Sequence, residues 1–124
     1  MNGRHLRVHK RLFESFKDAI SGFLLALAQE RNLKIQLAAA VLVLCFSWSI
    51  RVSLIYLVII FVLIGGVISL ELINTAVERL VDLVTKENHP IAKAAKDTAA
   101  AAVWWFSVMA AVIFIVIVCA TLFH

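Results

Sequence analysis

The sequence predicts an all-α membrane protein, with three membrane-spanning helices preceded by one amphipathic helix. Of the 124 residues, 63% are hydrophobic and only 16% are charged, whereas soluble domains usually carry about 25% charged residues. Three long apolar stretches are present, and the segment before them repeats its apolar residues at a helical spacing. At this length we expect one domain, residues 1–124, with lipid as the solvent for most of it.

A helix over residues 10–29 is predicted by the positions of its apolar side chains. Phe13, Phe16, Ile20 and Leu24 recur at steps of three and four residues, while the charged residues of the segment fall mostly on the opposite face. Phe and Leu on one face with basic residues on the other are typical of a helix lying in the membrane surface. Its simplest role would be to anchor the N-terminus.

Three transmembrane helices are predicted over residues 33–50, 52–71 and 98–123. Each run approaches or exceeds the ~20 residues that a helix needs to cross a hydrocarbon layer of about 30 Å. No alternation with a period of two suggests a barrel, and helices satisfy their own backbone polar groups in lipid. The first run is interrupted only by Lys34 and Gln36. Gly65 and Gly66 give the second run a small-residue surface suited to close helix packing.

The positions of Lys and Arg predict the orientation in the membrane. Basic residues precede the first run and lie between the second and third, whereas the first loop holds only Arg51. Cytoplasmic loops carry the excess of Lys and Arg. We therefore expect a cytoplasmic N-terminus and second loop, and an outward-facing first loop and C-terminus. All eight acidic residues fall on the cytoplasmic side in this arrangement, so any chemistry is expected there.

Several site types are excluded by the motifs. Neither GxxxxGK[ST] nor GxGxxG occurs, so the two common nucleotide-binding loops are absent. Cys45 and Cys119 lie in different apolar runs and indicate small hydrophobic residues rather than a disulfide framework. No His cluster indicates zinc, and composition alone would make His89 a solvated loop residue.

A polar stripe follows the second apolar run in the segment ELINTAVERLVDL. Glu71, Asn74, Glu78 and Asp82 are spaced by three or four residues, so they lie along one face of a helix. Ionisable residues at membrane depth usually mark function. Mg²⁺ takes one or two carboxylates together with water and phosphate oxygens, and a carboxylate in apolar surroundings suits a general base. Ordinary acids at a solvated helix end are the alternative, strongest for Asp82.

Other charged residues would lie at the same side of the membrane as this stripe. Glu30 adds a carboxylate at the start of the first span, and Lys93, Lys96 and Arg11 are cations able to bind phosphate. An ion pathway is a second interpretation, but no acid lies in the outer half of a span. A structural or regulatory membrane subunit is a third, and it leaves the polar stripe without a purpose.

Three segments resemble the prokaryotic diacylglycerol kinase family, which includes undecaprenol kinases: RNLKIQ, ELINTAVERLVDLV and HPIAKAAKDTAAAAV. The resemblance implies a homotrimer of three-span subunits in the bacterial inner membrane. It further implies Mg²⁺-dependent transfer of the ATP γ-phosphate to a lipid hydroxyl at the cytoplasmic interface. No nucleic acid is expected as a partner.

The same resemblance implies roles for individual residues. Glu71 corresponds to the general base, with Asn74 supporting it, and it also meets the lipid substrate. Glu30 and Glu78 correspond to carboxylates that bind Mg²⁺ and nucleotide. Lys96 and Asp97 correspond to residues at the phosphates and ribose, and Glu87 and His89 to residues near the adenine. Arg11 and Ser15 correspond to positions on the surface helix: Arg11 contacts the nucleotide and the lipid headgroup, and Ser15 contacts the lipid.

The implied position of His89 near the adenine replaces its interpretation as a solvated loop residue. Asp82 has no assigned role. Ala100 departs from those family members that have Ser near the lipid substrate. The loop with Pro90 is more similar to undecaprenol-type members than to glycerolipid-type members. We therefore expect undecaprenol as the substrate, with diacylglycerol as the alternative.

Overall fold

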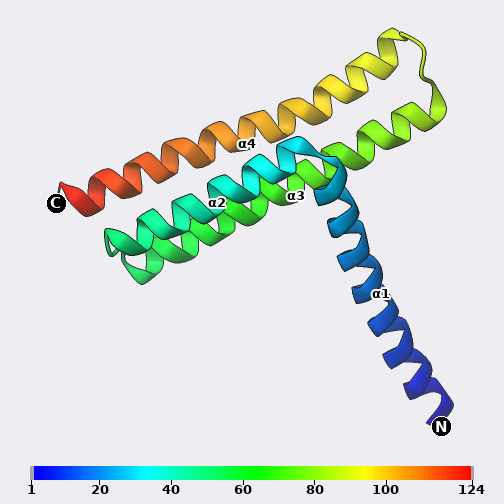
Figure 1. Cartoon of the computed structure of the whole chain (residues 1–124), viewed down its shortest axis with the longest axis horizontal. Coiled ribbons are helices and arrows are strands. Elements are labelled where there is room, and N and C mark those ends of the chain that lie inside the picture. The colour runs from blue at the N-terminus through cyan, green and yellow to red at the C-terminus, as the bar shows by residue number, and fades with distance from the viewer. Residues whose placement is uncertain (1, 124) are drawn as a thin grey trace.

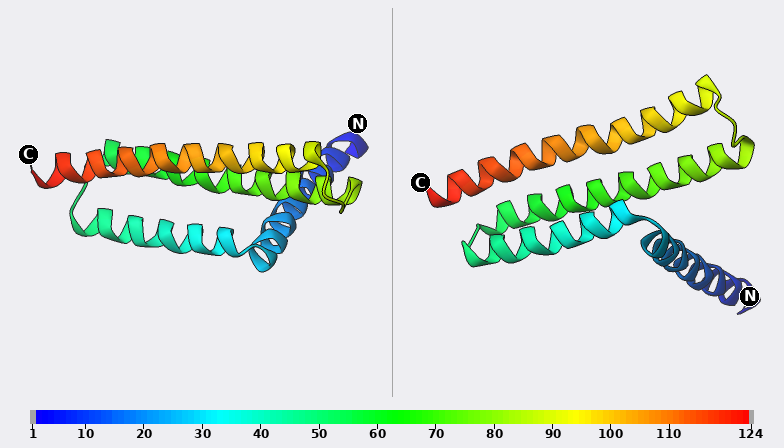
Figure 2. Two further views of the ribbon diagram at one scale, coloured as in Figure 1. Left: turned by 90° about the horizontal axis from the view of Figure 1, so that it is seen from above. Right: turned by 45° about the horizontal axis from the view of Figure 1, so that its top comes forward.

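The structure, a computed structural model, describes residues 2–123 and confirms the all-α membrane fold (Figure 1). No strand occurs within these residues, and three of the helices are long and apolar enough to cross a membrane. The helices α2, α3 and α4 lie side by side and alternate in direction, whereas α1 leaves this bundle (Figure 2). The elements are α1 (Asn2–Gln29), α2 (Arg31–Ser49), α3 (Leu54–Val84) and α4 (Pro90–Leu122).

The three spanning helices differ in length, and the difference defines a polar end of the bundle. α2 has 19 residues, about 28 Å of helix, which matches a hydrocarbon layer of about 30 Å. α3 and α4 have 31 and 33 residues, or about 46 and 50 Å. Both helices extend past the start of α2 at the end where residues 85–89 join them (Figure 1). The predicted run 52–71 therefore covers only the N-terminal part of α3, and the run 98–123 only the C-terminal part of α4, because both helices continue into polar sequence.

Local sequence explains the tight connection between α2 and α3. Arg51 has a φ of 59°, and its N–H bonds the carbonyl of Trp48 while Val52 N–H bonds the carbonyl of Ser47. This pair of bonds is the Schellman arrangement that closes many helices. Ser53 then caps α3, its hydroxyl accepting a bond from Tyr56 N–H at 3.4 Å. Two helix ends are thus satisfied within a few residues.

Packing within the bundle is closest between α3 and α4. Gly66 of α3 faces the ring of Phe106 of α4, and a Cβ atom at Gly66 would lie 2.3 Å from Phe106 Cζ. Gly65 has no atom within 4 Å of the corresponding position. One glycine of the predicted small-residue surface therefore allows a close approach of these two helices.

The first helix turns away from the bundle at a single residue. Glu30 has extended backbone angles between α1 and α2, with φ −106° and ψ 113°. Near this turn Ala26 is buried, and Arg79 of α3 donates to Gln29 Oε1 at 2.8 Å. α1 begins at Asn2, earlier than the predicted residue 10, and its apolar residues Phe13 and Phe16 are exposed. Such an unpacked apolar face suits the surface of a bilayer.

Candidate active site

Glu71 lies at the interface of α3 with α2 and is almost fully buried, with 4% of its surface exposed. Its Oε2 accepts a hydrogen bond from Nε2 of Gln36 at 3.1 Å. Gln36 follows the first residue of α2, Arg31, by about 8 Å of helical rise. Glu71 therefore lies just inside the polar end of the bundle. A buried carboxylate at this level is placed to take a proton from a group that arrives through the bilayer.

The next turn of α3 continues the polar stripe. Asn74 is 7% exposed, and its Nδ2 donates to Glu78 Oε1 at 3.5 Å. In this structure the amide therefore bonds Glu78, whereas the family resemblance implied that Asn74 supports Glu71. Oδ1 of Asn74 is buried and has no hydrogen-bond partner within residues 2–123. Thr75 is buried beside it, whereas Glu78 is half-buried. The stripe thus changes from a buried carboxylate at Glu71 to a partly solvated one at Glu78, over two helical turns.

Two ion pairs occupy the polar end of α3 and α4. Lys96 Nζ lies 2.6 Å from Asp82 Oδ1, which joins the two helices across the loop. Lys93 pairs with Asp97 one turn further along α4. The hydrogen bond and the charge of Asp97 raise the pKa of Lys93 above its ordinary value. Lys96 and Asp97, both expected at the nucleotide, are each engaged with a partner in this structure.

A loop pocket of about 660 Å³ lies beside these pairs and contains four of the expected nucleotide residues, Glu87, His89, Lys96 and Asp97. Its volume falls within the range of ordinary small-molecule sites, about 300–1,000 Å³. The charges balance, because the lining carries three acids and three lysines. The complete lining is Asp82, Thr85, Lys86, Glu87, Asn88, His89, Pro90, Ala92, Lys93, Lys96 and Asp97.

His89 has a structural task in this loop. It is the residue before the first helical position of α4, and its Nδ1 accepts a bond from Ile91 N–H at 3.1 Å. Pro90 occupies the first turn, where a missing N–H costs nothing. This capping uses one ring nitrogen and leaves Nε2 for another partner. The loop end of α4 is thereby fixed next to the pocket.

Glu30 is brought to the level of Glu78 by the turn between α1 and α2. Glu30 is half-buried, and its neighbour Gln29 is bonded to Arg79, the residue after Glu78. Within residues 2–123 no three His, Cys, Asp or Glu side chains are grouped to hold a metal. Two carboxylates are nonetheless a sufficient protein contribution for Mg²⁺, which keeps water and phosphate oxygens in its other positions.

Arg11 and Ser15 are not brought to this site within one chain. Both are exposed on the part of α1 that diverges from the bundle (Figure 2). Along the helix axis they precede Gln29 by about 27 and 21 Å. The structure therefore separates these two residues from the stripe on α3.

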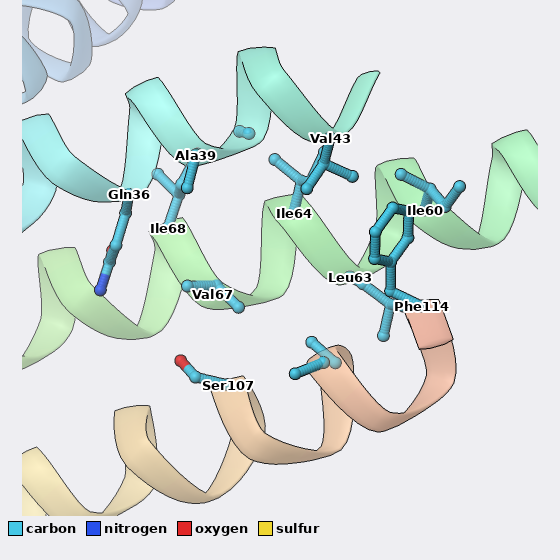
Figure 3. Close-up of a pocket in the computed structure, with 13 residues that line it drawn as sticks. Gln36, Ala39, Val43, Ile60, Leu63, Ile64, Val67, Ile68, Ser107 and Phe114 are labelled. Atoms are coloured by element: carbon cyan, nitrogen blue, oxygen red, sulfur yellow. The ribbon is translucent and has the colours of Figure 1, made fainter. Parts of the chain in front are cut away.

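Gln36 is the site residue that the sequence argument missed. It lies at one end of an apolar groove of about 320 Å³ formed by α2, α3 and α4, and Figure 3 shows its side chain extending from α2 toward α3. Ser107 is the other polar residue of the lining, among residues such as Val43, Ile64 and Phe114. The available signal was a polar residue within an otherwise apolar span, which usually has a specific partner.

The sequence is similar to known proteins. Residues 17–118 match the prokaryotic diacylglycerol kinase family. The undecaprenol kinase of Bacillus subtilis (strain 168) is 48% identical over 96 residues, which are 77% of this chain and 78% of that protein. The diacylglycerol kinase of Synechocystis sp. is 35% identical over 95 residues, or 76% of this chain and 54% of that protein. The family match contains every site residue from Glu30 to Asp97, whereas Arg11 and Ser15 precede it.

Proposed function

The chain belongs to the prokaryotic diacylglycerol kinase family and is a membrane-embedded lipid kinase, and from this premise we propose that it phosphorylates undecaprenol with ATP. The observation that carries the proposal is the position of Glu71. A buried carboxylate lies between α2 and α3, just inside the polar end of the bundle, and a pocket with three lysines lies further along α3, where residues 85–89 join it to α4. Membership in a kinase family disfavours the ion pathway and the purely structural subunit.

The proposed reaction divides the site into a lipid side and a nucleotide side. Glu71 takes the proton from the lipid hydroxyl while the hydroxyl oxygen attacks the γ-phosphorus of ATP. ADP leaves with the electrons of the broken P–O bond. Such a transfer depends mainly on positioning and on neutralising charge. Asn74 holds Glu78 by its amide, and Lys96 turns from Asp82 to the phosphates. Glu87, His89 and Asp97 line the remainder of the nucleotide pocket.

We propose Mg²⁺ as the cofactor, with Glu30 and Glu78 as its protein ligands. Both are partly solvated carboxylates at the level of the α1–α2 turn, and a hard cation prefers such oxygen ligands. Oδ1 of Asn74, which is buried and has no partner among residues 2–123, adds an oxygen acceptor next to Glu78. When bound, the ion neutralises the phosphate charge that builds up during transfer.

Undecaprenol is favoured over diacylglycerol by two sequence observations. The 48% identical relative is an undecaprenol kinase, and the 35% identical relative is a diacylglycerol kinase. The Pro90 loop, which caps α4, is also more similar to the undecaprenol type. Diacylglycerol remains the second candidate, because a relative of that specificity matches over three quarters of the chain.

The assembly and the orientation are part of the same proposal. We propose a homotrimer in the bacterial inner membrane, with the N-terminus and residues 85–89 cytoplasmic and the C-terminus outside. Lys86, Lys93 and Lys96 support this orientation, because they lie together at the loop end of α3 and α4 and cytoplasmic loops carry the excess of Lys and Arg. Cross-linking and light scattering in detergent would test the trimer, and a dimer or monomer would contradict it.

The function is tested with purified protein in detergent, labelled ATP, Mg²⁺ and either undecaprenol or diacylglycerol. We expect labelled undecaprenyl phosphate, formed with the higher kcat/KM of the two lipids. Phosphatidic acid as the preferred product would instead support the second candidate. Absence of any labelled lipid from both substrates would overturn the proposed kinase reaction.

The base is tested by Glu71→Gln, which keeps the shape of the side chain and an oxygen for Gln36 to bond. General-base catalysis contributes about 10²–10⁴-fold, so we expect kcat to fall by that factor while nucleotide binding is retained. Glu14→Gln, at an exposed position of α1, is the matched control and should leave kcat unchanged. Near-normal turnover by Glu71→Gln would remove Glu71 from the role of base.

A further inference from the structure

We propose that Gln36 is the positioning residue of Glu71, holding one carboxylate oxygen so that the other faces the acceptor hydroxyl. The inference rests on the proposed function and deepens it, because it gives the general base a partner on a different helix. Gln36 ends the segment RNLKIQ, which resembles the family, but that resemblance assigns it no role. Its basis is the geometry at the α2–α3 interface.

The contact joins two side chains that have few alternatives. Gln36 Nε2 donates to Glu71 Oε2 at 3.1 Å, across 35 residues of sequence. Glu71 is 4% exposed, so water cannot readily replace the amide as its donor. Gln36 is the hydrogen-bond partner that the structure gives Glu71 among residues 2–123. Loss of this donor would leave a buried carboxylate with less solvation and a freely rotating side chain.

Fixing Oε2 has a direct consequence for Oε1 of Glu71. The bond to Oε2 and the burial of the side chain together restrict rotation of the carboxylate, so the second oxygen points in a narrower range of directions. Proton transfer needs the base within about 2.6–3.2 Å of the hydroxyl oxygen. Misplacement of reacting groups by about 1 Å costs on the order of 10²-fold in rate. The amide of Gln36 therefore controls the distance and direction from Oε1 of Glu71 to the acceptor hydroxyl.

The location of Gln36 also connects the base with the apolar groove. Gln36 lines the groove together with aliphatic residues of α3 and α4 (Figure 3). Its own Oε1 is buried and has no partner within the described part of the chain. A buried acceptor without a donor is destabilising and is not expected at a residue kept only for packing. A functional requirement for the Nε2 donor of Gln36 at Glu71 explains why a residue with an unbonded buried oxygen is present here.

The test is Gln36→Met, which keeps the length of the side chain and removes the amide. We expect kcat to fall at least tenfold while KM for Mg–ATP stays within twofold of the wild type, because the nucleotide pocket lies elsewhere. Gln36→Asn keeps an amide that is one methylene too short for the contact and should lose a similar factor. Ile35→Met, on the exposed side of α2, is the matched control and should retain full kcat.

The outcomes separate positioning from a structural role. A kcat within twofold of the wild type for Gln36→Met or Gln36→Asn would overturn the proposal. A rise in KM for Mg–ATP in parallel with the loss of kcat and of thermal stability would also overturn it, because a general loss of structure explains that pattern.

A second measurement does not depend on turnover and so distinguishes this proposal from the proposed function. The infrared carboxylate band of Glu71 is obtained as the difference between wild type and Glu71→Gln. Removal of the Gln36 donor should shift this band in Gln36→Met and leave it unchanged in Ile35→Met. An unshifted band would refute the contact even if the kinase reaction is confirmed, and a shifted band would support it even if another lipid is the substrate.

Discussion

Gly66→Ala is expected to loosen the pairing of α3 with α4, and its neighbour Gly65→Ala supplies the comparison. A Cβ atom at Gly66 would lie 2.3 Å from Cζ and 2.5 Å from Cε1 of Phe106. Ordinary contacts between carbon atoms are about 3.5–4.0 Å, so the ring must move by more than about 1 Å. Phe106 is half-buried, so a movement of its ring away from Gly66 weakens its contact with α3.

The magnitude follows from two opposing terms. Forcing extra volume into a packed contact typically costs about 1–3 kcal/mol, while replacing a helical Gly by Ala gains about 0.8–1.0 kcal/mol. Gly65→Ala receives only the gain, because no atom lies within 4 Å of its Cβ position. The gain cancels in the comparison, so Gly66→Ala should be less stable than Gly65→Ala by about 1–3 kcal/mol.

Thermal unfolding in detergent measures this difference, at one fixed protein concentration because oligomer stability depends on concentration. Adding Phe106→Leu to Gly66→Ala removes the ring and should restore most of the lost stability. Equal stability of Gly66→Ala and Gly65→Ala would refute the reasoning. It would mean that the ring of Phe106 does not limit the approach of the two helices.

Three further predictions concern the polar end and the outer loop. Glu78→Gln should raise KM for Mg–ATP at least tenfold; full recovery in excess Mg²⁺ would restrict Glu78 to metal binding and contradict a wider nucleotide role. Lys96→Met should likewise raise KM for Mg–ATP by tenfold or more. It should change the free energy of unfolding by less than about 1 kcal/mol, because the pair of Lys96 with Asp82 is partly exposed. An unchanged KM would show that Lys96 does not bind the phosphates. Arg51→Gly should stabilise the protein by about 1 kcal/mol, since φ is 59° and glycine adopts this region without strain; a lower thermal midpoint would contradict this.

The sequence predicted those parts of the fold that depend on residues near one another along the chain. Apolar runs identify the membrane-spanning parts of α2, α3 and α4, because lipid solvates long helices of such composition. The spacing of Glu71, Asn74, Glu78 and Asp82 correctly placed four polar side chains on one face of α3. Both kinds of inference use only helical periodicity, which is fixed by backbone geometry.

Contacts between helices could not be predicted from the spacing of residues along the sequence. The bond from Gln36 to Glu71 joins residues 35 positions apart, and the pair of Lys96 with Asp82 depends on how α3 and α4 turn toward each other. The early start of α1 at Asn2 was missed as well, because the first residues lack the apolar repeat that predicted residues 10–29. His89 was assigned from resemblance alone, and its capping of α4 appears only in three dimensions.

The one-residue turn at Glu30 connects the two helices that meet the bilayer differently, and Glu30 is also a residue that we expect to bind Mg²⁺. Only Glu30 separates α1, which suits the membrane surface, from α2, which just spans the hydrocarbon layer. A thicker or thinner membrane changes the tilt of a spanning helix, whereas α1 stays in the interface plane. The change in angle between them must then be absorbed by the two backbone dihedrals of Glu30, the carboxylate expected to bind Mg²⁺. A change in bilayer thickness would therefore act on the backbone of the residue that we expect to bind Mg²⁺.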